Sequence, residues 1–228
     1  MQQLRVLLSL GSNLGDRLKY LQAATNALKQ FPNSHITAIS AVYESPPWGI
    51  DETPAYLNAV LLLVVDTSAF NIDNIDNIDN ITDDIINSTV NSTIIINNIK
   101  EILNELLLYC QLIEKKYHRV RVEHKQYAAR TLDIDILYAE LSNNYYKDDD
   151  SQLKKVITNN QYLDMLIIHS KNLTIPHARF AIRAFALKPA LDIWYSQTSR
   201  NKLLNWYNKP NIQIDEKKVI KTKYIIYL

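Results

Sequence analysis

The stretch "ARTLDIDILYA" at residues 129–139 has the pattern of a β-strand that carries two aspartates within an apolar run. With a period of two, Leu132, Ile134 and Ile136 point to one side, while Asp133 and Asp135 share the other. Two ionised carboxylates side by side repel each other, and their removal from water is unfavourable unless a cation compensates. The pattern therefore predicts one face packed in a core and one acidic face that holds a positive charge.

The segments before this strand predict an alternation of strands and helices. Three runs have the apolar residues and flanking turn residues of strands, at residues 4–10, 35–45 and 55–66. An amphipathic helix that begins at Asp16 is expected over residues 16–31, and a second over residues 98–118, which end in a basic cluster. The order strand, helix, strand, strand, helix, strand predicts an α+β fold, a ferredoxin-like sheet with helices packed on it.

Two insertions interrupt this plan within what we expect to be a single domain over residues 1–228. Residues 71–97 are rich in Asn, Ile and Asp, and the period of three in "NIDNIDNIDN" fits neither a strand nor a helix. A flexible low-complexity insertion is the first interpretation, and a cation-binding tract without the spacing of a calcium loop is the alternative. Residues 140–170 begin with polar and charged residues and predict a second insertion with a short packed element at its end.

The composition limits the classes of partner. The 228 residues include 25 Lys+Arg and 24 Asp+Glu, so no global basic field favours nucleic acid. The single cysteine, Cys110, cannot form an internal disulfide, and no apolar run approaches the roughly 20 residues needed to cross a bilayer. We therefore expect a cytoplasmic monomer that binds small molecules and neither nucleic acid nor a membrane.

Two segments in the first quarter of the chain suggest ligand contacts. The turn "LGSNLGD" at residues 10–16 would let backbone amides approach a ligand, although a tight strand-to-helix turn explains it equally, and the Walker lysine is missing. In "YESPPWGIDETPAYLNA", residues 43–59, stiff prolines position Trp48, and Asn58 offers a donor and an acceptor to a flat heteroaromatic ligand. The alternative is that Trp48 and Tyr56 are core aromatics.

Basic residues gather at two further places. The first cluster lies just before the paired acids and contains Arg119, Arg121, Lys125 and Arg130. Guanidinium groups beside a divalent ion are what a polyphosphate requires, although a charge run is more often a solvated face. In the second, "LTIPHARFAIRAFAL" at residues 173–187, His177 lies near Arg179 and Arg183. A histidine in such a loop is either a satisfied polar residue or a donor to a phosphate.

Taken together, these motifs resemble the 6-hydroxymethyl-7,8-dihydropterin pyrophosphokinases of folate biosynthesis. Five segments match in the order of the family: "LGSNLGDR", "VYESPPWG", "PAYLNAV", "RTLDIDIL" and "LTIPHARFAIRAFAL". The resemblance covers nearly the whole chain except the two insertions. It implies a ferredoxin-like fold and the transfer of a pyrophosphoryl group from ATP to the hydroxymethyl oxygen of the pterin, with release of AMP and two magnesium ions.

The resemblance also implies roles for individual residues. Asp133 and Asp135 would bind both magnesium ions, and Arg121 and Arg130 would hold phosphates and stabilise the transition state. The remaining ATP contacts would come from Gln111, Glu114, Ile136, Thr174, His177 and Arg183. The pterin pocket would be lined by Ser45, Pro46, Trp48, Tyr56, Asn58 and Phe185. Tyr127 would be a further ATP-binding residue. It is also the candidate for the aromatic of the mobile loop that stacks on the pterin ring.

The chain departs from the family pattern in the loop before Arg130 and beside the histidine motif. One extra residue follows Arg121, and "QYAAR" replaces the usual aromatic, small residue and proline. Asn172 stands where an arginine or lysine is common, and Ala178 follows the Pro-His pair.

Two alternatives to the pyrophosphokinase are a nucleotidyltransferase and a binding module without turnover. A polymerase-β-type nucleotidyltransferase places its acidic pair soon after a Gly-Ser turn, whereas more than a hundred residues separate Ser12 from Asp133. A pterin- or nucleotide-binding module without turnover would have no need for the acids, arginines and histidine that this chain retains.

Overall fold

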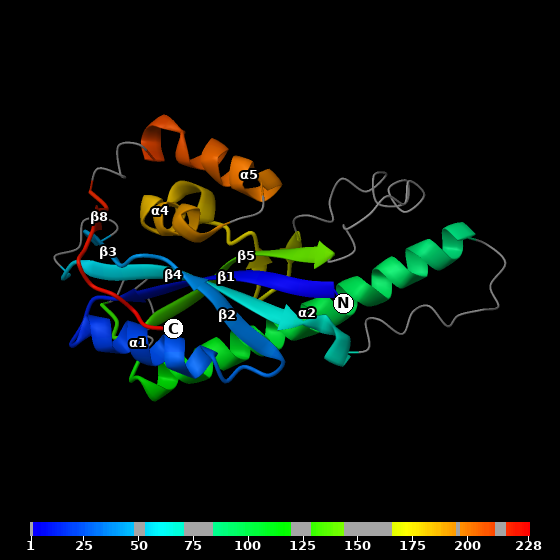
Figure 1. Cartoon of the computed structure of the whole chain (residues 1–228), viewed down its shortest axis with the longest axis horizontal. Coiled ribbons are helices and arrows are strands. Elements are labelled where there is room, and N and C mark those ends of the chain that lie inside the picture. The colour runs from blue at the N-terminus through cyan, green and yellow to red at the C-terminus, as the bar shows by residue number, and fades with distance from the viewer. Residues whose placement is uncertain are drawn as a thin grey trace.

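An antiparallel sheet with helices on both faces forms the described part of the chain (Figure 1). The computed structural model describes residues 2–47, 53–70, 84–119, 129–143, 166–194, 197–212 and 218–228. The strands of the main sheet are β1 (Gln2–Ser12), β2 (Ser34–Ile39), β3 (Tyr43–Ser45), β4 (Tyr56–Asp66), β5 (Asp133–Asn143) and β8 (Ile220–Lys221). Their order is β5-β1-β4-β3-β8, with β2 also paired to β4, and all of these pairs are antiparallel. The predicted mixture of helices and sheet is confirmed.

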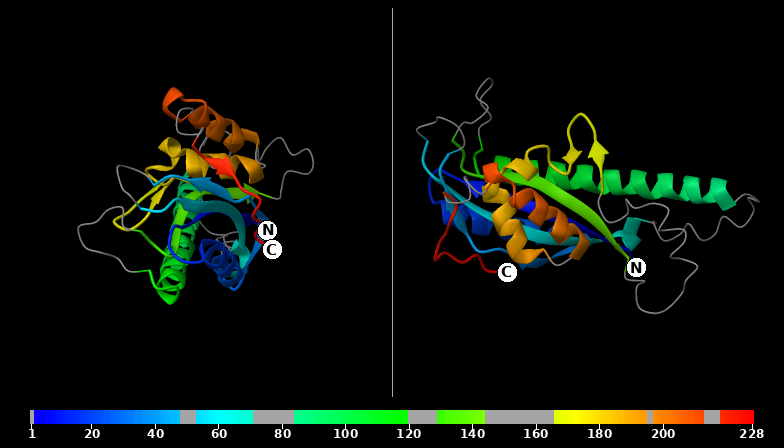
Figure 2. Two further views of the ribbon diagram at one scale, coloured as in Figure 1. Left: turned by 90° about the vertical axis from the view of Figure 1, so that its left-hand side faces the viewer. Right: turned by 90° about the horizontal axis from the view of Figure 1, so that it is seen from above.

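The helices pack on the sheet as two separate layers. They are α1 (Arg17–Leu28), α2 (Asp84–Lys116), α4 (Ala184–Ile193) and α5 (Gln197–Tyr207), with 3-10 segments η1 (Thr67–Phe70) and η3 (Phe180–Ile182). Figures 1 and 2 show α1 and α2 on one face of the sheet and α4 and α5 on the other. A second sheet pairs β6 (Ile168–His169) with β7 (Thr174–Ile175). Among the described helices, none has both the length and the apolar composition of a membrane span.

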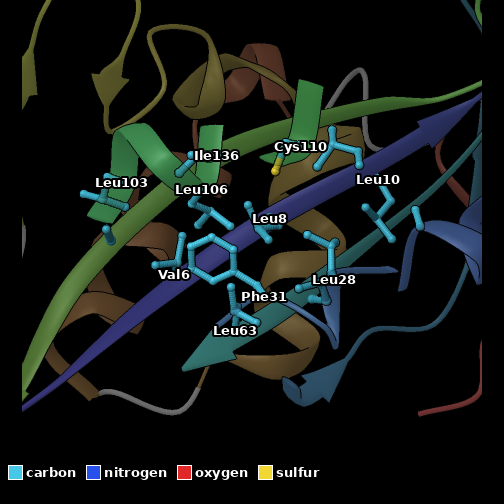
Figure 3. Close-up of a cluster of buried hydrophobic side chains, with 14 of the residues drawn as sticks. Val6, Leu8, Leu10, Leu28, Phe31, Leu63, Leu103, Leu106, Cys110 and Ile136 are labelled. Carbon is cyan, nitrogen blue, oxygen red and sulfur yellow. The ribbon is translucent and has the colours of Figure 1, made fainter. Parts of the chain in front are cut away.

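Strand β1 lies between β5 and β4 in the sheet and is buried on both faces. Its residues Val6, Leu8 and Leu10 pack against α1 and α2, as Figure 3 shows. Leu7 points to the opposite face, where it packs with residues of α4 and α5. Burial of a large aliphatic side chain contributes roughly 1.5–3 kcal/mol, so this strand anchors both layers. The polar residues at its two ends therefore have fixed positions relative to β4 and β5.

Helix α1 begins as its sequence predicts. The side chain of Asp16 accepts a hydrogen bond from the backbone N–H of Lys19 at 3.1 Å, which satisfies one of the donors left unpaired at a helix N-terminus. This confirms Asp16 as the residue at which the helix begins.

The single strand predicted over residues 35–45 is wrong, because β2 ends at Ile39 and β3 begins only at Tyr43. Ser40 lies at the break and is buried. Its Oγ accepts from the N–H of Val60 at 2.9 Å and donates to the carbonyl of Ala41 at 2.7 Å. The side chain thus replaces ladder hydrogen bonds and turns the chain between the two strands.

The segment at residues 71–97 also differs from expectation, since residues 84–97 are helical and belong to α2. Figures 1 and 2 show that the beginning of α2 extends past the end of the sheet. Apolar residues from Ile99 to Ile113 dock the helix on the core, and a helix once nucleated propagates through a sequence that has neither Pro nor Gly. The prediction that no helix forms here is wrong for these residues, and residues 71–83 lie outside the described part.

The second predicted insertion begins later than expected. Residues 140–143 continue β5, because Glu140 pairs across the sheet with Arg5 and Leu141 with Leu4. Residues 144–165 lie outside the described part. The short packed element expected at the end is present as β6, in which Ile168 is buried.

Candidate active site

A pocket lies at the edge of the sheet where β1 ends and its neighbours β4 and β5 begin. Gly11 of β1 pairs with Asn58 of β4 on one side and with Asp133 of β5 on the other. A Cβ at position 11 would lie 3.5 Å from Asn58 Oδ1 and 3.8 Å from Asp133 Cβ, so glycine keeps the space between them open. The residues that line the pocket are Ser9, Gly11, Ser45, Pro46, Pro47, Thr53, Tyr56, Asn58, Arg130, Asp133, Asp135, Arg183 and Phe185.

Most of the residues chosen from the sequence come together in this pocket. The lining includes Ser45, Pro46, Tyr56, Asn58, Arg130, Asp133, Asp135, Arg183 and Phe185. Gln111, Glu114, Ile136, Thr174 and His177 are not among its lining residues. Arg121, Trp48 and Tyr127 lie outside the described part of the chain.

The two aspartates share one face of β5, as the period of two predicts. Their apolar neighbours Ile134 and Ile136 are buried on the opposite face, in the core under α1 and α2. Burial, together with the negative charge of Asp133, raises the pKa of Asp135 to about 7, against the opposing effects of Arg183 and Arg119. The side chain of Asp135 still keeps 35% of its surface exposed, so a cation can reach it.

Two arginines hold Asp133 in place. Arg130 Nη1 lies 2.7 Å from Asp133 Oδ2, and Arg119 Nη1 lies 2.7 Å from Asp133 Oδ1. All three side chains are at least three-quarters buried. The sequence placed Arg119 in the basic cluster but gave it no role; its contact with Asp133 depends on how α2 ends beside β5, which sequence spacing does not reveal.

Glu114 supports this arrangement from behind the pocket. It is buried near the end of α2, where Oε1 accepts from the backbone N–H of Ile134 at 2.8 Å and pairs with Arg119. A carboxylate in this position fixes the start of β5 and the guanidinium beside it. The geometry gives Glu114 a supporting contact with Arg119, in addition to the nucleotide contact expected from the sequence.

The other end of the pocket is less charged, with lining residues that include Asn58, Ser45 and Phe185. Asn58 Nδ2 donates to Ser45 Oγ at 2.9 Å, and both residues are buried. The ring of Phe185 lies 5.5 Å from the guanidinium carbon of Arg183, which is cation–π distance. Thr53 Oγ1 is buried and makes no hydrogen bond to any residue that the structure describes. This end therefore combines aromatic and proline walls with amide and hydroxyl groups.

Sequence reasoning missed Ser9, Gly11, Pro47 and Thr53 as pocket residues. Gly11 lies in the turn motif of residues 10–16, and Pro47 and Thr53 lie in the motif of residues 43–59, so these motifs contained a signal for all three. Ser9 lies inside an apolar strand, and only the pairing of β1 with its neighbours brings it to the pocket.

His177 lies beside the acidic end but outside the pocket lining. Its Nδ1 accepts from the backbone N–H of Arg179 at 3.2 Å, which leaves the proton of the neutral ring on Nε2. Burial lowers the pKa of His177, and the positive charges of Arg183 and Arg179 lower it further. A neutral imidazole with an Nε2–H can donate a hydrogen bond to a phosphate oxygen without transferring a proton.

The acidic end fits a magnesium ion that also binds phosphate. Magnesium is usually held by one or two carboxylates together with water and substrate phosphates. Within the described ranges, no cluster of three or more His, Cys, Asp or Glu side chains could enclose a metal. Asp133 and Asp135 are the two carboxylates of the pocket lining, and Asp135, whose charge is disfavoured by burial and by Asp133, is the one that a cation would stabilise.

The chain is similar to known proteins over most of its length. The sequence profile of the family described as "7,8-dihydro-6-hydroxymethylpterin-pyrophosphokinase (HPPK)" matches residues 7–85 and 80–195. A 2-amino-4-hydroxy-6-hydroxymethyldihydropteridine pyrophosphokinase of Mycobacterium leprae (strain TN) is 29% identical over 189 residues, which cover 83% of this chain and 71% of that protein. The folic acid synthesis protein fol1 of Pneumocystis carinii is 29% identical over 188 residues, 82% of this chain and 17% of that protein.

Among solved structures, an HPPK-DHPS in complex with substrates matches with a TM-score of 0.45 and 13% sequence identity. The match covers 94% of this chain and 46% of that one, so this chain spans less than half the length of the solved chain. The family profile itself covers well over half of this chain, in two stretches that meet at residues 80–85. The chain belongs to the 7,8-dihydro-6-hydroxymethylpterin-pyrophosphokinase family, and its activity is that of a pyrophosphokinase in folate biosynthesis.

Proposed function

We propose that the pocket at the ends of β1, β4 and β5 transfers the pyrophosphoryl group of ATP to the hydroxymethyl oxygen of 6-hydroxymethyl-7,8-dihydropterin. One observation carries this assignment: a single pocket joins an aromatic, amide-bearing end to an end with paired acids and arginines. The first end suits a flat heterocycle, and the second suits a polyphosphate with its metal. The two substrates would therefore meet near Gly11, between Asn58 and Asp133.

The pterin would lie at the end formed by Asn58, Ser45 and Phe185. The hydrogen bond from Asn58 Nδ2 to Ser45 Oγ fixes the amide, so that Asn58 Oδ1 can accept from a ring N–H. Phe185, beside Arg183, offers an aromatic face on which a heterocycle can stack. These contacts orient the hydroxymethyl group without acting on it chemically.

Asp133 and Asp135 would hold magnesium, and we propose that two ions bind there together with the triphosphate of ATP. Bound magnesium neutralises phosphate charge and aligns the reacting oxygens for in-line transfer. The support for this is the pair of carboxylates in the pocket lining and the stabilisation that a cation would give Asp135. The two arginines on Asp133 hold its carboxylate in one orientation while the phosphates bind.

The arginines would stabilise charge on the transferred group. Arg130 and Arg183 line the pocket, and Arg121 joins them in this proposal on the strength of the family resemblance. The hydroxyl oxygen of the pterin forms a bond to the β-phosphorus, and the bond from that phosphorus to the α,β-bridging oxygen breaks. AMP leaves with the bridging oxygen, and the hydroxyl proton passes to solvent. Fixed guanidinium donors are effective here because they need no reorganisation as charge develops.

We also propose a ferredoxin-like sheet, an insertion within residues 71–97 and a monomeric, cytoplasmic protein. The order β5-β1-β4, with β2 and β3 beyond β4 and two helices on one face, supports a ferredoxin-like sheet. The meeting of the two profile matches at residues 80–85 supports an insertion within residues 71–97. A monomer in the cytoplasm, over a single domain of residues 1–228, stays a prediction.

A product assay tests the function. The purified chain is incubated with ATP, magnesium and 6-hydroxymethyl-7,8-dihydropterin, and the nucleotide products are separated by chromatography. AMP that forms only when the pterin is present is the expected result. Release of pyrophosphate would support the nucleotidyltransferase instead, and binding of both ligands without products would support a module that lacks turnover.

Replacement of Asn58 tests the pterin end separately. We expect Asn58→Ala to weaken pterin binding about 10- to 100-fold, because loss of a buried hydrogen-bonding group typically costs 1–3 kcal/mol. The affinity for a non-hydrolysable ATP analogue should stay within about twofold. Calorimetric titration of each ligand measures both values. Ser45→Ala, which removes only the partner hydroxyl, should have a smaller effect; a uniform loss for both ligands would contradict this assignment.

A further inference from the structure

Asn13, the residue that follows β1, connects the two loops that carry the opposite ends of the pocket. It is 1% exposed. Its backbone N–H donates to the carbonyl of Arg130 at 3.1 Å, and its Oδ1 accepts from the backbone N–H of Arg130 at 2.7 Å. Its Nδ2 donates to the carbonyl of Pro54 at 3.2 Å. One side chain thus binds the backbone before β5 and the backbone before β4.

These contacts occur where the ladders of the sheet end. Gly11 is the last residue of β1 with a partner in β5, and Ser12 the last with a partner in β4. Beyond this point β1 has no further ladder pairs with β4 or β5. The side-chain amide of Asn13 adds one more hydrogen bond to the segment before β5 and one to the segment before β4.

Only a primary amide meets both requirements at this position. Oδ1 faces an N–H and must accept, whereas Nδ2 faces a carbonyl and must donate. The reversed amide would place donor against donor and acceptor against acceptor, so the orientation is fixed by its partners. A carboxylate could keep the first contact but not the second, because it has no proton to offer the Pro54 carbonyl.

The two segments that Asn13 connects both carry residues of the pocket lining. Pro54 and Ala55 lie between Thr53 and Tyr56, which both line the pocket. The carbonyl of Ala55 is held in turn by Arg17 Nη1 at 2.7 Å. On the other side, Arg130 lines the pocket and binds Asp133. Asn13 itself is not among the lining residues.

We propose that Asn13 is a positioning residue that sets the spacing between the pterin end and the phosphate end of the pocket. This proposal rests on the proposed function of the two ends. In-line transfer requires the reacting atoms to be within about 3–3.5 Å, so a small shift between the two ends reduces turnover sharply. Asn13 acts through Pro54 and Arg130, and its two contacts can be removed separately.

Two Asn13 variants separate these contacts. Asn13→Asp keeps an acceptor for the Arg130 N–H and loses the donor to Pro54, so it should raise the KM for the pterin about tenfold and leave the KM for ATP within about twofold. Asn13→Ala loses both side-chain contacts, so it should raise both KM values and lower kcat about 100-fold. Initial rates of AMP formation over a grid of both substrates give these constants.

A change at Arg17 tests the segment of Pro54 and Ala55 independently of Asn13. Arg17→Met removes the hydrogen bond to the Ala55 carbonyl and keeps most of the side-chain stem, so it should reproduce the pterin-selective effect of Asn13→Asp. Ser40→Ala is the matched control, because Ser40 is also buried and also bridges two backbone segments, away from the pocket lining. It should lower the melting temperature and leave the ratio of the two KM values unchanged.

The results test the positioning role of Asn13 separately from the proposed function of the pocket. Absence of AMP with the wild-type chain would count against the proposed function, and dissociation constants for the pterin and an ATP analogue would then decide the positioning role. Equal changes in both constants for Asn13→Asp, or no change, would overturn the proposal. So would a shift in the KM ratio caused by Ser40→Ala.

Discussion

Asp135→Asn is expected to lower kcat at least about 10³-fold while the protein remains folded, since the change removes the charge of a carboxylate that we propose binds magnesium. The change is nearly isosteric, and the residue lies on the pocket face of β5, not in the apolar core. Rates of AMP formation at saturating ATP, magnesium and pterin measure the effect. Magnesium titration should show weakened binding by the variant.

The same variant has a predicted consequence for stability. The pKa of Asp135 is raised from its ordinary value near 3.8 to about 7 in the metal-free fold. The folded state then binds this proton more tightly than the unfolded chain does, so the metal-free protein loses stability as the pH rises from about 4 to 7. Asparagine carries no charge, and metal-free Asp135→Asn should unfold at pH 8 at a temperature no lower than wild type.

A matched control lies on the same strand. Glu140→Gln also neutralises a buried carboxylate of β5, but that carboxylate pairs with Arg5 at 3.8 Å and does not line the pocket. We expect this control to keep wild-type turnover within a few-fold. Magnesium-dependent activity of Asp135→Asn close to wild type would refute the assignment of that residue.

Arg130→Ala is expected to produce the second-largest loss, about 10²- to 10³-fold in kcat, since it removes a fixed charged donor that we propose stabilises the transferred group. The guanidinium lies 2.7 Å from Asp133 Oδ2, so the change also frees one side of that carboxylate. Arg130→Lys keeps the charge but loses the planar arrangement of donors, and it should recover only part of the activity.

Arg5→Ala provides the comparison for Arg130. Arg5 also pairs with an acid of β5, but it lies on β1 at the opposite end of the strand pairing from Gly11. It should retain turnover within a few-fold. If Arg130→Ala lowered only the melting temperature and left kcat unchanged, Arg130 would be structural and its proposed role wrong.

Local patterns in the sequence predicted the parts of the site that depend on one strand or one turn. The alternation in residues 129–139 placed Asp133 and Asp135 on one face, because side-chain direction in a strand is set by the backbone alone. Asp16 likewise identified the start of α1, because an N-cap bond spans only three residues.

The parts that the sequence did not predict depend on partners far along the chain. Arg119 contacts Asp133 only because α2 ends beside β5, and Ser9 reaches the pocket only because β1 pairs with β4 and β5. The turn motif gave a weak signal for Asn13, whose hydrogen-bond partners lie 41 and 117 residues away. The break at Ser40 depends on its contact with β4, and the helix over residues 84–97 continues from the part of α2 that docks on the core.

The most direct test of the central claim is phosphorus NMR of the complete reaction. The chain, ATP, magnesium and 6-hydroxymethyl-7,8-dihydropterin are mixed, and the resonances of the products are followed with time. AMP and a pterin carrying a diphosphate ester are expected to appear at equal rates and in equal amounts. Inorganic pyrophosphate together with an adenylylated pterin, or no pterin diphosphate at all, would contradict it.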